Sequence, residues 1–423
     1  MLDLRSIRED PEPARAALRR RGAADTLDEL LGLDERRREL LPELEEGRAR
    51  RNRVSDEIAQ LKRAGKDADE LIAEMRDLGG VLKEREAELA RVEAERDELA
   101  ATLPNLPAPE APDGDTEEDA VTLREVGDRP EFDFEVRDHL DLGAAHGWIE
   151  MEKASEASGS RFAYLMGDLV MVEMALIRLV LDLLREEAMT PVVPPVLVRE
   201  GPLFGTGFFP GEREMIYEVP RDELYLVGTS EVSLAALHAG EIMAADDLPR
   251  RYAGYSTCFR REAGAAGRDT RGIFRVHQFD KVEMFSFVEP AESDTEHERL
   301  LAIQERILQM LEIPYRVVDI AAGDLGASAA RKFDCEAWIP SQERYREVTS
   351  CSNTTDYQAR RLDCRFRPEP EAQPAPVHTL NGTALAVGRT LIALTENGQQ
   401  ADGSVRLPGP LVEAGLPEVI GAT

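Results

Sequence analysis

The sequence predicts an α+β fold, in which a long helical arm precedes a globular part built on an antiparallel β-sheet flanked by helices. Apolar residues recur at heptad spacing between about residues 26 and 103, which is typical of a coiled coil. The uncharged run 255–259 and the roughly alternating run 276–287 predict two antiparallel strands joined by a turn rich in glycine and charge. With 423 residues, the chain is long enough for two or three domains.

The first 22 residues predict a short helix that ends at Gly22. Two heptad registers follow, over residues 33–61 and 71–99, with six and seven apolar residues at their nine core positions. A break near Gly65 separates them, so the pair predicts an antiparallel coiled-coil hairpin. At a rise of about 1.5 Å per residue, helices of about 36 residues would each be roughly 55 Å long.

Basic residues gather in the middle of this arm. Residues 47–66 hold seven basic and two acidic residues, a local net charge of +5 on a chain whose formal net charge is −31. The overall charge repels phosphates and argues against nucleic acid as a partner, unless the basic residues are concentrated. A solvated coiled-coil face is one interpretation, and a tip that follows an RNA backbone is the one we favour. The candidate RNA contacts are Arg48, Arg50, Arg51, Arg53, Lys62 and Arg63.

Prolines at positions 104, 107, 109 and 112 end the second arm helix, and an acidic run follows over 113–119. We therefore expect a linker over 104–120, between a first domain of residues 1–103 and a second of residues 121–423. In the second domain, residues 169–188 predict a long amphipathic helix. The next segment, MTPVVPPVLV, is β-branched but dense in proline, which predicts a strand at the edge of a sheet.

The cysteines and the hydropathy of the chain indicate the cellular compartment of the protein. The four cysteines form no CxxC pair, so a zinc site is not expected, and scattered thiols are typical of a reducing compartment. The first 22 residues lack the apolar core of a signal peptide, and the apolar stretch 165–184 is interrupted by charges. We expect a cytoplasmic protein without a membrane span. The acid excess fits either a saline cytoplasm or plain solubility.

The predicted strand pair carries side chains suited to an anion that bears a purine. Arg260 can bind a phosphate or carboxylate with two parallel hydrogen bonds. Phe279 can offer its ring face to a base. Glu262 and Glu283 can accept protons from an amino or hydroxyl group. The plain alternative is an ordinary hairpin with a solvated charged loop.

Two further polar runs leave both interpretations open. Thr229-Ser230-Glu231 follows a predicted strand at 224–228 and is typical of a helix N-cap with an acid in the first turn. The run 345–353 places a carboxylate and hydroxyls on a strand, where they could share a hard cation with phosphates. A half-buried strand with polar residues facing outward accounts for it equally well.

The order Phe-Arg-x-Glu, loop, Arg-x-x-x-Phe-x-x-x-Glu over 259–283 resembles motif 2 of class II aminoacyl-tRNA synthetases. The words CFRREAG, GRDTRG and HQFDKVEM resemble the seryl-tRNA synthetase version. The segment with Pro195 resembles motif 1, and the segment 378–389, which ends in Arg389, resembles motif 3. The resemblance runs from Met1 to about Pro410 and covers all three motifs in order.

The resemblance implies a class II catalytic domain that follows a tRNA-binding arm. The implied reaction is activation of L-serine by ATP with Mg²⁺, then transfer of the seryl group to the 3′ end of tRNA(Ser), with tRNA(Sec) as a further substrate. The implied assembly is a homodimer through the motif 1 region.

The resemblance also implies the site residues. Catalytic roles fall to Arg260 and Arg389. The expected serine contacts are Thr229, Ser230, Glu231, Glu283 and Thr383. The expected ATP contacts are Arg260, Arg261, Glu262, Val276, Phe279, Glu347, Val348, Thr349, Ser350 and Arg389. Glu347 and Ser350 are the expected Mg²⁺ ligands.

Two other functions compete with this one. A seryl-tRNA synthetase relative could charge a carrier protein or resist an antibiotic analogue, but the intact arm argues against the carrier version. A catalytically silent paralogue could bind only RNA or a protein partner. Arg260, Glu262, Phe279, Glu283 and Arg389 are all retained, which argues against the silent version.

Overall fold

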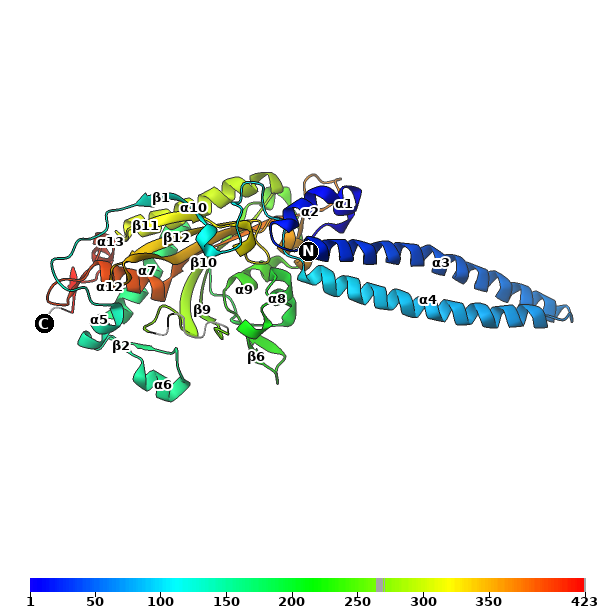
Figure 1. The fold of residues 1–423 in the computed structure, drawn as a ribbon, viewed down its shortest axis with the longest axis horizontal. Coiled ribbons are helices and arrows are strands. Elements are labelled where there is room, and N and C mark those ends of the chain that lie inside the picture. The colour runs from blue at the N-terminus through cyan, green and yellow to red at the C-terminus, as the bar shows by residue number, and fades with distance from the viewer. Residues whose placement is uncertain (264–268, 270, 422–423) are drawn as a thin grey trace. The chain divides into compact units, whose positions relative to one another are not determined.

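The structure is a computed structural model that describes residues 1–263, 269 and 271–421. It divides into two compact units, residues 2–103 and a second unit of Met1 with residues 104–423, and each is described by itself (Figure 1). The loop expected at the hairpin tip, with Gly264, Gly267 and Arg268, lies outside the described residues.

The first unit consists of four helices, α1 (Leu4–Glu9), α2 (Pro11–Arg19), α3 (Ala24–Arg63) and α4 (Asp69–Thr102). The prediction of one short helix over residues 1–22 is wrong, because the chain breaks between α1 and α2. Asp10 is extended there, with φ −145° and ψ 96°, as expected for a residue that precedes a proline. Gly22 takes a left-handed φ of 66° in the turn after α2.

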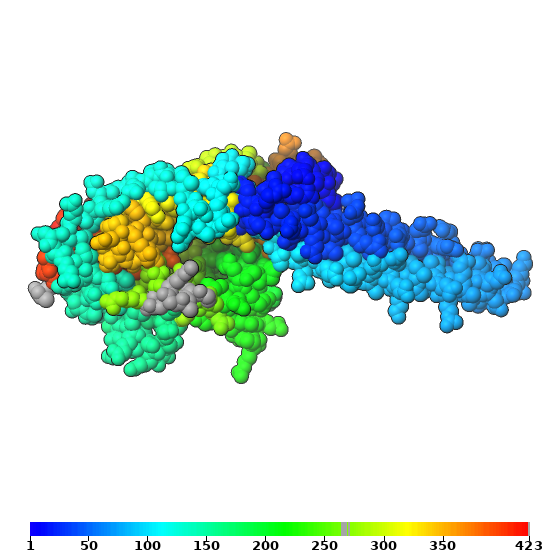
Figure 2. Space-filling model, viewed as in Figure 1, coloured from blue at the N-terminus to red at the C-terminus, as the bar shows by residue number. Residues whose placement is uncertain are grey.

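Helices α3 and α4 form the antiparallel coiled-coil hairpin that the heptads predict (Figure 1). Their side chains pack against one another along the arm (Figure 2). Leu40, Leu44, Leu82 and Val92 are buried in the seam. The heptad position of Gly47 lets the helices approach closely, since a Cβ there would lie 2.6 Å from Leu82 Cδ2.

The second unit is built on an eight-stranded sheet in the order β1-β11-β12-β13-β16-β10-β9-β4. The strands are β1 (Val121–Val126), β11 (Tyr315–Asp319), β12 (Arg331–Ile339), β13 (Arg344–Asn353), β16 (His378–Ala386), β10 (Gln278–Val288), β9 (Arg250–Phe259) and β4 (Thr190–Val192). All neighbours are antiparallel except β4 and β9. The predicted β9–β10 hairpin is confirmed, and β4, which contains Pro191, lies at the sheet edge as predicted.

Three helices bury one face of this sheet, α7 (Asp168–Glu186), α10 (Ser293–Met310) and α12 (Val387–Asn397). Their apolar faces share one core with the strands, in which Leu176, Ile303 and Leu391 are buried with Met284 and Cys351. Helix α7 confirms the amphipathic helix expected over 169–188. The opposite face carries polar side chains at the pocket, and a second apolar cluster that includes Phe285 and Phe287 of β10.

Shorter elements surround the sheet. The helices are α5 (His139–His146), α6 (Glu152–Ser158), α8 (Glu200–Thr206), α9 (Glu231–Ala235), α11 (Tyr357–Leu362) and α13 (Gly409–Glu413). The strands are β2 (Ile149–Glu150), β3 (Tyr164–Leu165), β5 (Leu197–Val198), β6 (Tyr217–Val219), β7 (Leu224–Leu226), β8 (Ile242–Ala244), β14 (Arg365–Arg367), β15 (Ala375–Pro376), β17 (Val405–Arg406) and β18 (Val419–Ile420). None of the described helices combines the length and apolarity needed to cross a membrane.

The proline-rich segment after α4 is bound along the second unit. The backbone N–H groups of Asn105 and Ala108 donate to the carbonyl oxygens of Ala327 and Ala330, both at 2.8 Å. The side chain of Asn105 is buried and donates to the carbonyl oxygen of Thr354. This segment is therefore fixed by specific hydrogen bonds.

Candidate active site

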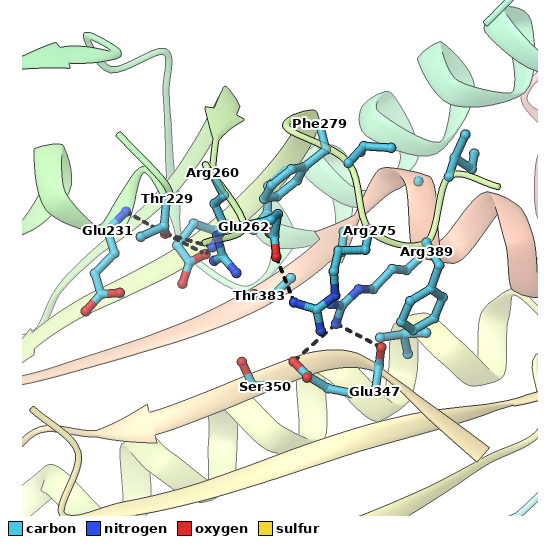
Figure 3. A pocket seen from close by; sticks show the side chains of 18 of the residues that line it. Thr229, Glu231, Arg260, Glu262, Arg275, Phe279, Glu347, Ser350, Thr383 and Arg389 are labelled. Carbon is cyan, nitrogen blue, oxygen red and sulfur yellow. Dashed lines mark hydrogen bonds and ion pairs between the residues drawn. The ribbon is translucent and has the colours of Figure 1, made fainter. Parts of the chain in front are cut away.

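A pocket opens on the face of the sheet opposite α7, α10 and α12, and it contains about 830 Å³ of space, its open mouth included. Strands β10, β13 and β16 supply its walls, together with the segment that follows β9, the start of α12 and the turn before α9 (Figure 3). Polar and charged side chains from distant parts of the sequence converge here, and Figure 3 shows Arg260, Glu347, Thr383 and Arg389 around one space.

Most residues expected to contact serine or ATP line this pocket. They are Thr229, Glu231, Arg260, Glu262, Val276, Phe279, Glu283, Glu347, Val348, Ser350, Thr383 and Arg389.

Three of the expected residues do not line it. The Ser230 hydroxyl is buried and donates to the carbonyl oxygen of Gly254. Arg261 is exposed, with its guanidinium 6.0 Å from the centroid of the Tyr217 ring. Thr349 is buried on the helix-covered face of β13. In the extended strand β13, Thr349 alternates with Ser350 and therefore points away from the pocket. Ser230 is the N-cap of α9 and has a helical backbone, with φ −67° and ψ −13°.

Strand β10 presents every second side chain to the pocket, namely Phe279, Lys281 and Glu283. Lys281 was not among the expected site residues, although its position between Phe279 and Glu283 is a signal that could have identified it. The Lys281 ammonium is buried, donates to Thr229 Oγ1 at 2.7 Å and forms an ion pair with Glu283. The base of the pocket therefore contains a carboxylate that is already neutralised.

A β-bulge brings Glu347 and Ser350 to the same face of β13. In a regular strand, residues three apart point to opposite faces, so the expected alternation would not have joined them. The register with β12 shifts between Cys335–Thr349 and Glu336–Glu347, which leaves Val348 as an extra residue. As a result both side chains point into the pocket, as Figure 3 shows.

Strand β16 contains a second bulge. The register with β10 shifts between Val282–Leu385 and Glu283–Thr383, so Ala384 is the extra residue. Thr383 therefore lies directly opposite Glu283, and both line the pocket.

One end of the pocket contains the Arg389 guanidinium and the Glu347 carboxylate. Arg389 Nη1 lies 3.4 Å from Glu347 Oε1 and donates to the Glu347 carbonyl oxygen at 3.0 Å. Burial alone would raise the pKa of Glu347, but the positive charges of Arg389, and then of Lys332, hold that pKa below its usual range. These cations therefore favour the ionised carboxylate, which can share a cation with a phosphate.

Aromatic rings and guanidinium groups are stacked in the middle of the pocket. The guanidinium carbon of Arg260 lies 5.4 Å from the Phe279 ring centroid. The Phe274 ring has Arg389 at 4.8 Å and Arg346 at 3.9 Å. Such an arrangement holds guanidinium groups in fixed orientations and suits a flat, negatively charged ligand.

Glu262 is engaged within the protein. Its Oε2 accepts a hydrogen bond from Arg275 Nη1 at 2.7 Å, and its backbone has a left-handed φ of 51°. Arg275 also lies 3.8 Å from Asp269. Glu262 can therefore position the base of the loop as well as face a ligand.

Two buried carboxyl groups meet at the other end. Glu231 is 7% exposed, and its Oε1 accepts a hydrogen bond from Gln358 Nε2 at 2.8 Å. Burial first and Glu283 second raise the pKa of Glu231 to about 7. Thr229 Oγ1 accepts from the Glu231 backbone N–H at 3.2 Å, so the local turn interpretation and the pocket interpretation hold together. Gln358, too, was missed from the sequence.

The candidate RNA contacts on α3 fall into two groups. Arg48 pairs with Glu86 at 2.8 Å, and Arg50 pairs with Glu74. Within the described part of the chain, no acidic partner is found for Arg51, Arg53, Lys62 or Arg63. The second group is thus the better placed to bind an external anion.

Comparisons with known proteins agree over the whole chain. The seryl-tRNA synthetase N-terminal domain matches residues 1–107, and the tRNA synthetase class II core domain (G, H, P, S and T) matches residues 216–398. The serine–tRNA ligase of Acidothermus cellulolyticus is 52% identical over 97% of both chains. That of Rubrobacter xylanophilus is 49% identical over 100% of this chain and 99% of the relative.

Solved structures extend the comparison. The crystal structure of seryl-tRNA synthetase from Pyrococcus horikoshii complexed with ATP has a TM-score of 0.92 and 41% identity, and 99% of each chain is covered. The cytoplasmic serine–tRNA ligase from Naegleria fowleri in complex with AMP has a TM-score of 0.86 and 31% identity, with 97% of this chain and 96% of that one covered.

Proposed function

The chain belongs to the seryl-tRNA synthetase family, and we propose on that premise which of its residues perform the reaction. It is a class II ligase that activates L-serine with ATP and transfers the seryl group to the 3′ end of tRNA(Ser). The observation that carries the residue assignment is the convergence of Arg260, Arg389, Glu347 and the two carboxyl groups on one pocket.

The ATP end of the pocket lies between β10, β13 and α12. Phe279 stacks on adenine, Arg260 binds the α-phosphate and the serine carboxylate, and Arg389 neutralises the outer phosphates. The support is that all three side chains line the pocket, with the Arg260 guanidinium already held beside the Phe279 ring. No general base is needed, because the serine carboxylate is itself the nucleophile. The protein's task is therefore alignment and charge neutralisation.

Glu347 and Ser350 fit Mg²⁺ bound together with ATP. Both offer oxygen atoms on one face of β13, and Glu347 stays ionised. Among the described residues no cluster of three or more His, Cys, Asp or Glu side chains could hold a metal alone. Mg²⁺ commonly takes one or two protein oxygens and completes its shell with phosphates and water. When bound, it would neutralise charge on the phosphates.

Serine binds at the other end, among Thr229, Glu231, Glu283 and Thr383. Glu283 is paired with Lys281, and Thr383 lies opposite Glu283 on the neighbouring strand. A pocket with this many fixed polar groups leaves them unpaired when alanine binds, so alanine is strongly rejected. Threonine is opposed only by its extra methyl group, which provides about 1–3 kcal/mol.

Residues 1–103 bind tRNA, residues 104–120 join the domains and residues 121–423 catalyse the reaction. The exposed cations of α3 support the first assignment. Besides tRNA(Ser), tRNA(Sec) is a substrate. The working enzyme is a homodimer through the motif 1 region, where α7 exposes Met171 and Met174. The four cysteines are buried free thiols, which supports a reducing compartment, the cytoplasm.

Serine-dependent exchange of pyrophosphate into ATP tests the assignment. The purified protein should catalyse the exchange, and Arg260→Ala and Arg389→Ala should each lower kcat/KM by at least 100-fold, the usual scale for a lost charge-stabilising group. Arg261→Ala, on the neighbouring exposed side chain, is the matched control and should retain activity within about threefold of the unaltered protein. Equal losses at positions 260 and 261 would contradict the proposed roles.

A further inference from the structure

We propose that Gln304 is a positioning residue for serine activation. It belongs to α10, on the helix-covered face of the sheet, and sets the distance between β13, which carries Ser350, and β16, which carries Thr383. The inference rests on the proposed function, which assigns the Mg²⁺–ATP end to β13 and part of the serine end to β16.

The two strands separate where they reach the pocket. Their pairing covers only three residues of each strand, and it ends at Cys351 and Gly382. One residue further on, Ser350 pairs with β12 on its other side, and Thr383 pairs with β10. The bulges at Val348 and Ala384 follow immediately, so the usual ladder does not fix the distance between the pocket-lining ends.

Gln304 spans this separation with one amide group. Its Nε2 donates to the Ser350 carbonyl oxygen at 2.7 Å and to the Thr383 carbonyl oxygen at 2.9 Å. Since both neighbours are acceptors, only the NH₂ end of the amide can satisfy them. The side chain is fully buried, and its Oε1 has no hydrogen-bond partner among the described residues. These two hydrogen bonds are therefore what compensates its burial.

Gly382 makes room for this contact. A Cβ at position 382 would lie 2.9 Å from Cys351 Cβ and 3.3 Å from Gln304 Nε2. The spacing of the two strands is thus set by close contacts as well as by the amide. Any larger side chain at position 382 must push one of these neighbours aside.

The spacing of β13 and β16 affects how serine and ATP are placed relative to each other. The serine carboxylate must meet the α-phosphate in line, and an error of about 1 Å in such a placement lowers the rate by about 100-fold. Gln304 is not among the residues that line the pocket. Its removal changes the relative placement of the two half-sites but leaves the side chains that bind each substrate intact. The turnover number should therefore fall while both substrate affinities persist.

Gln304→Met tests this, because methionine has similar length and no donor. In serine-dependent pyrophosphate exchange by the full chain, we expect kcat to fall at least 30-fold, with KM for serine and KM for ATP each within about threefold of the unaltered protein. Gln309→Met is the matched control on the same helix. It removes a 2.7 Å bond to the Tyr315 hydroxyl, away from the pocket, and should leave kcat within about twofold.

The proposed function and the positioning role of Gln304 would be overturned by different results. An unaltered protein without exchange activity would overturn the proposed function itself. With an active unaltered protein, a kcat for Gln304→Met equal to that of the control, or a rise in KM as large as the loss in kcat, overturns the positioning role. If thermal unfolding shows that Gln304→Met does not fold, the same exchange assay is made on Gly382→Ala, which disturbs the same contact between the two strands. The same loss of kcat at retained KM supports the role, and unchanged kcat overturns it.

Discussion

At the scale of single residues, Glu231 couples function to stability. Its pKa is raised from 4.5 to about 7, by burial and by the nearby Glu283. A carboxyl group with a higher pKa in the folded than in the unfolded state binds more protons when folded, so stability falls as pH rises between the two values. Above pH 7 the loss is on the order of 3 kcal/mol.

Glu231→Gln should therefore stabilise the protein at high pH while it weakens serine binding. A glutamine at this position still accepts the hydrogen bond from Gln358 but never ionises. We expect a gain in the free energy of unfolding on the order of 3 kcal/mol at pH 8 that shrinks to about 1 kcal/mol at pH 5.5. Urea unfolding at the two pH values measures it. Glu218→Gln, on an exposed side chain, is the control, and a gain independent of pH would argue against the ionisation of Glu231.

At the scale of elements, the basic residues of α3 differ in whether they form ion pairs with α4. Arg51 and Arg53 form no ion pair with the described residues, so we expect their charge to be available to RNA phosphates. Arg48 and Arg50 share theirs with α4. The double variant Arg51→Gln with Arg53→Gln should raise KM for tRNA about tenfold. The slope of log affinity for tRNA against log salt concentration should become shallower by about two, because two phosphate contacts are lost. Serine-dependent pyrophosphate exchange, which needs no tRNA, should be unchanged.

Arg48→Gln with Arg50→Gln is the matched pair of substitutions for this test. It removes the same charge from the same helix but also releases Glu86 and Glu74. We expect a smaller rise in KM, about threefold. Equal effects of the two double variants would mean that ion pairing on the arm does not decide which cations meet the tRNA.

The two bulges are the element-scale features that sequence patterns miss. A period of two correctly aligns Phe279 and Glu283 on β10 but would separate Glu347 from Ser350. The extra residues, Val348 and Ala384, have side chains that are ordinary for a strand. A bulge depends on how two strands pair, so only the register of the assembled sheet reveals it.

At the scale of the whole molecule, the proposed homodimer requires an apolar surface. On α7, Met171 is 59% exposed and Met174 is 48% exposed, and Val193, after β4, is 81% exposed. Helix α7 and β4 pack together, so these side chains belong to one region of a protein whose residues are 32% charged. Exposed apolar patches of this kind mark interaction sites.

Met171→Asp with Met174→Asp should convert the dimer to a monomer, because the charges cannot be buried unpaired in an apolar interface. Sedimentation at micromolar concentration measures the change, and the unaltered protein should sediment as a dimer. Val81→Asp, on the arm, where Val81 is 54% exposed, is the control and should leave the dimer intact. A double variant that sediments like this control would exclude α7 as the interface.

Local patterns of the sequence alone determined the helices of the arm, the β9–β10 hairpin, the edge strand β4 and the family. These features depend on periodicity, on proline geometry and on motifs whose residues are close in the chain. The tertiary structure decided that Lys281 neutralises Glu283, that Ser230 and Thr349 face away from the pocket, and that Gln304 bridges β13 and β16. These outcomes depend on contacts between segments far apart in the chain and on strand register, which no local pattern encodes.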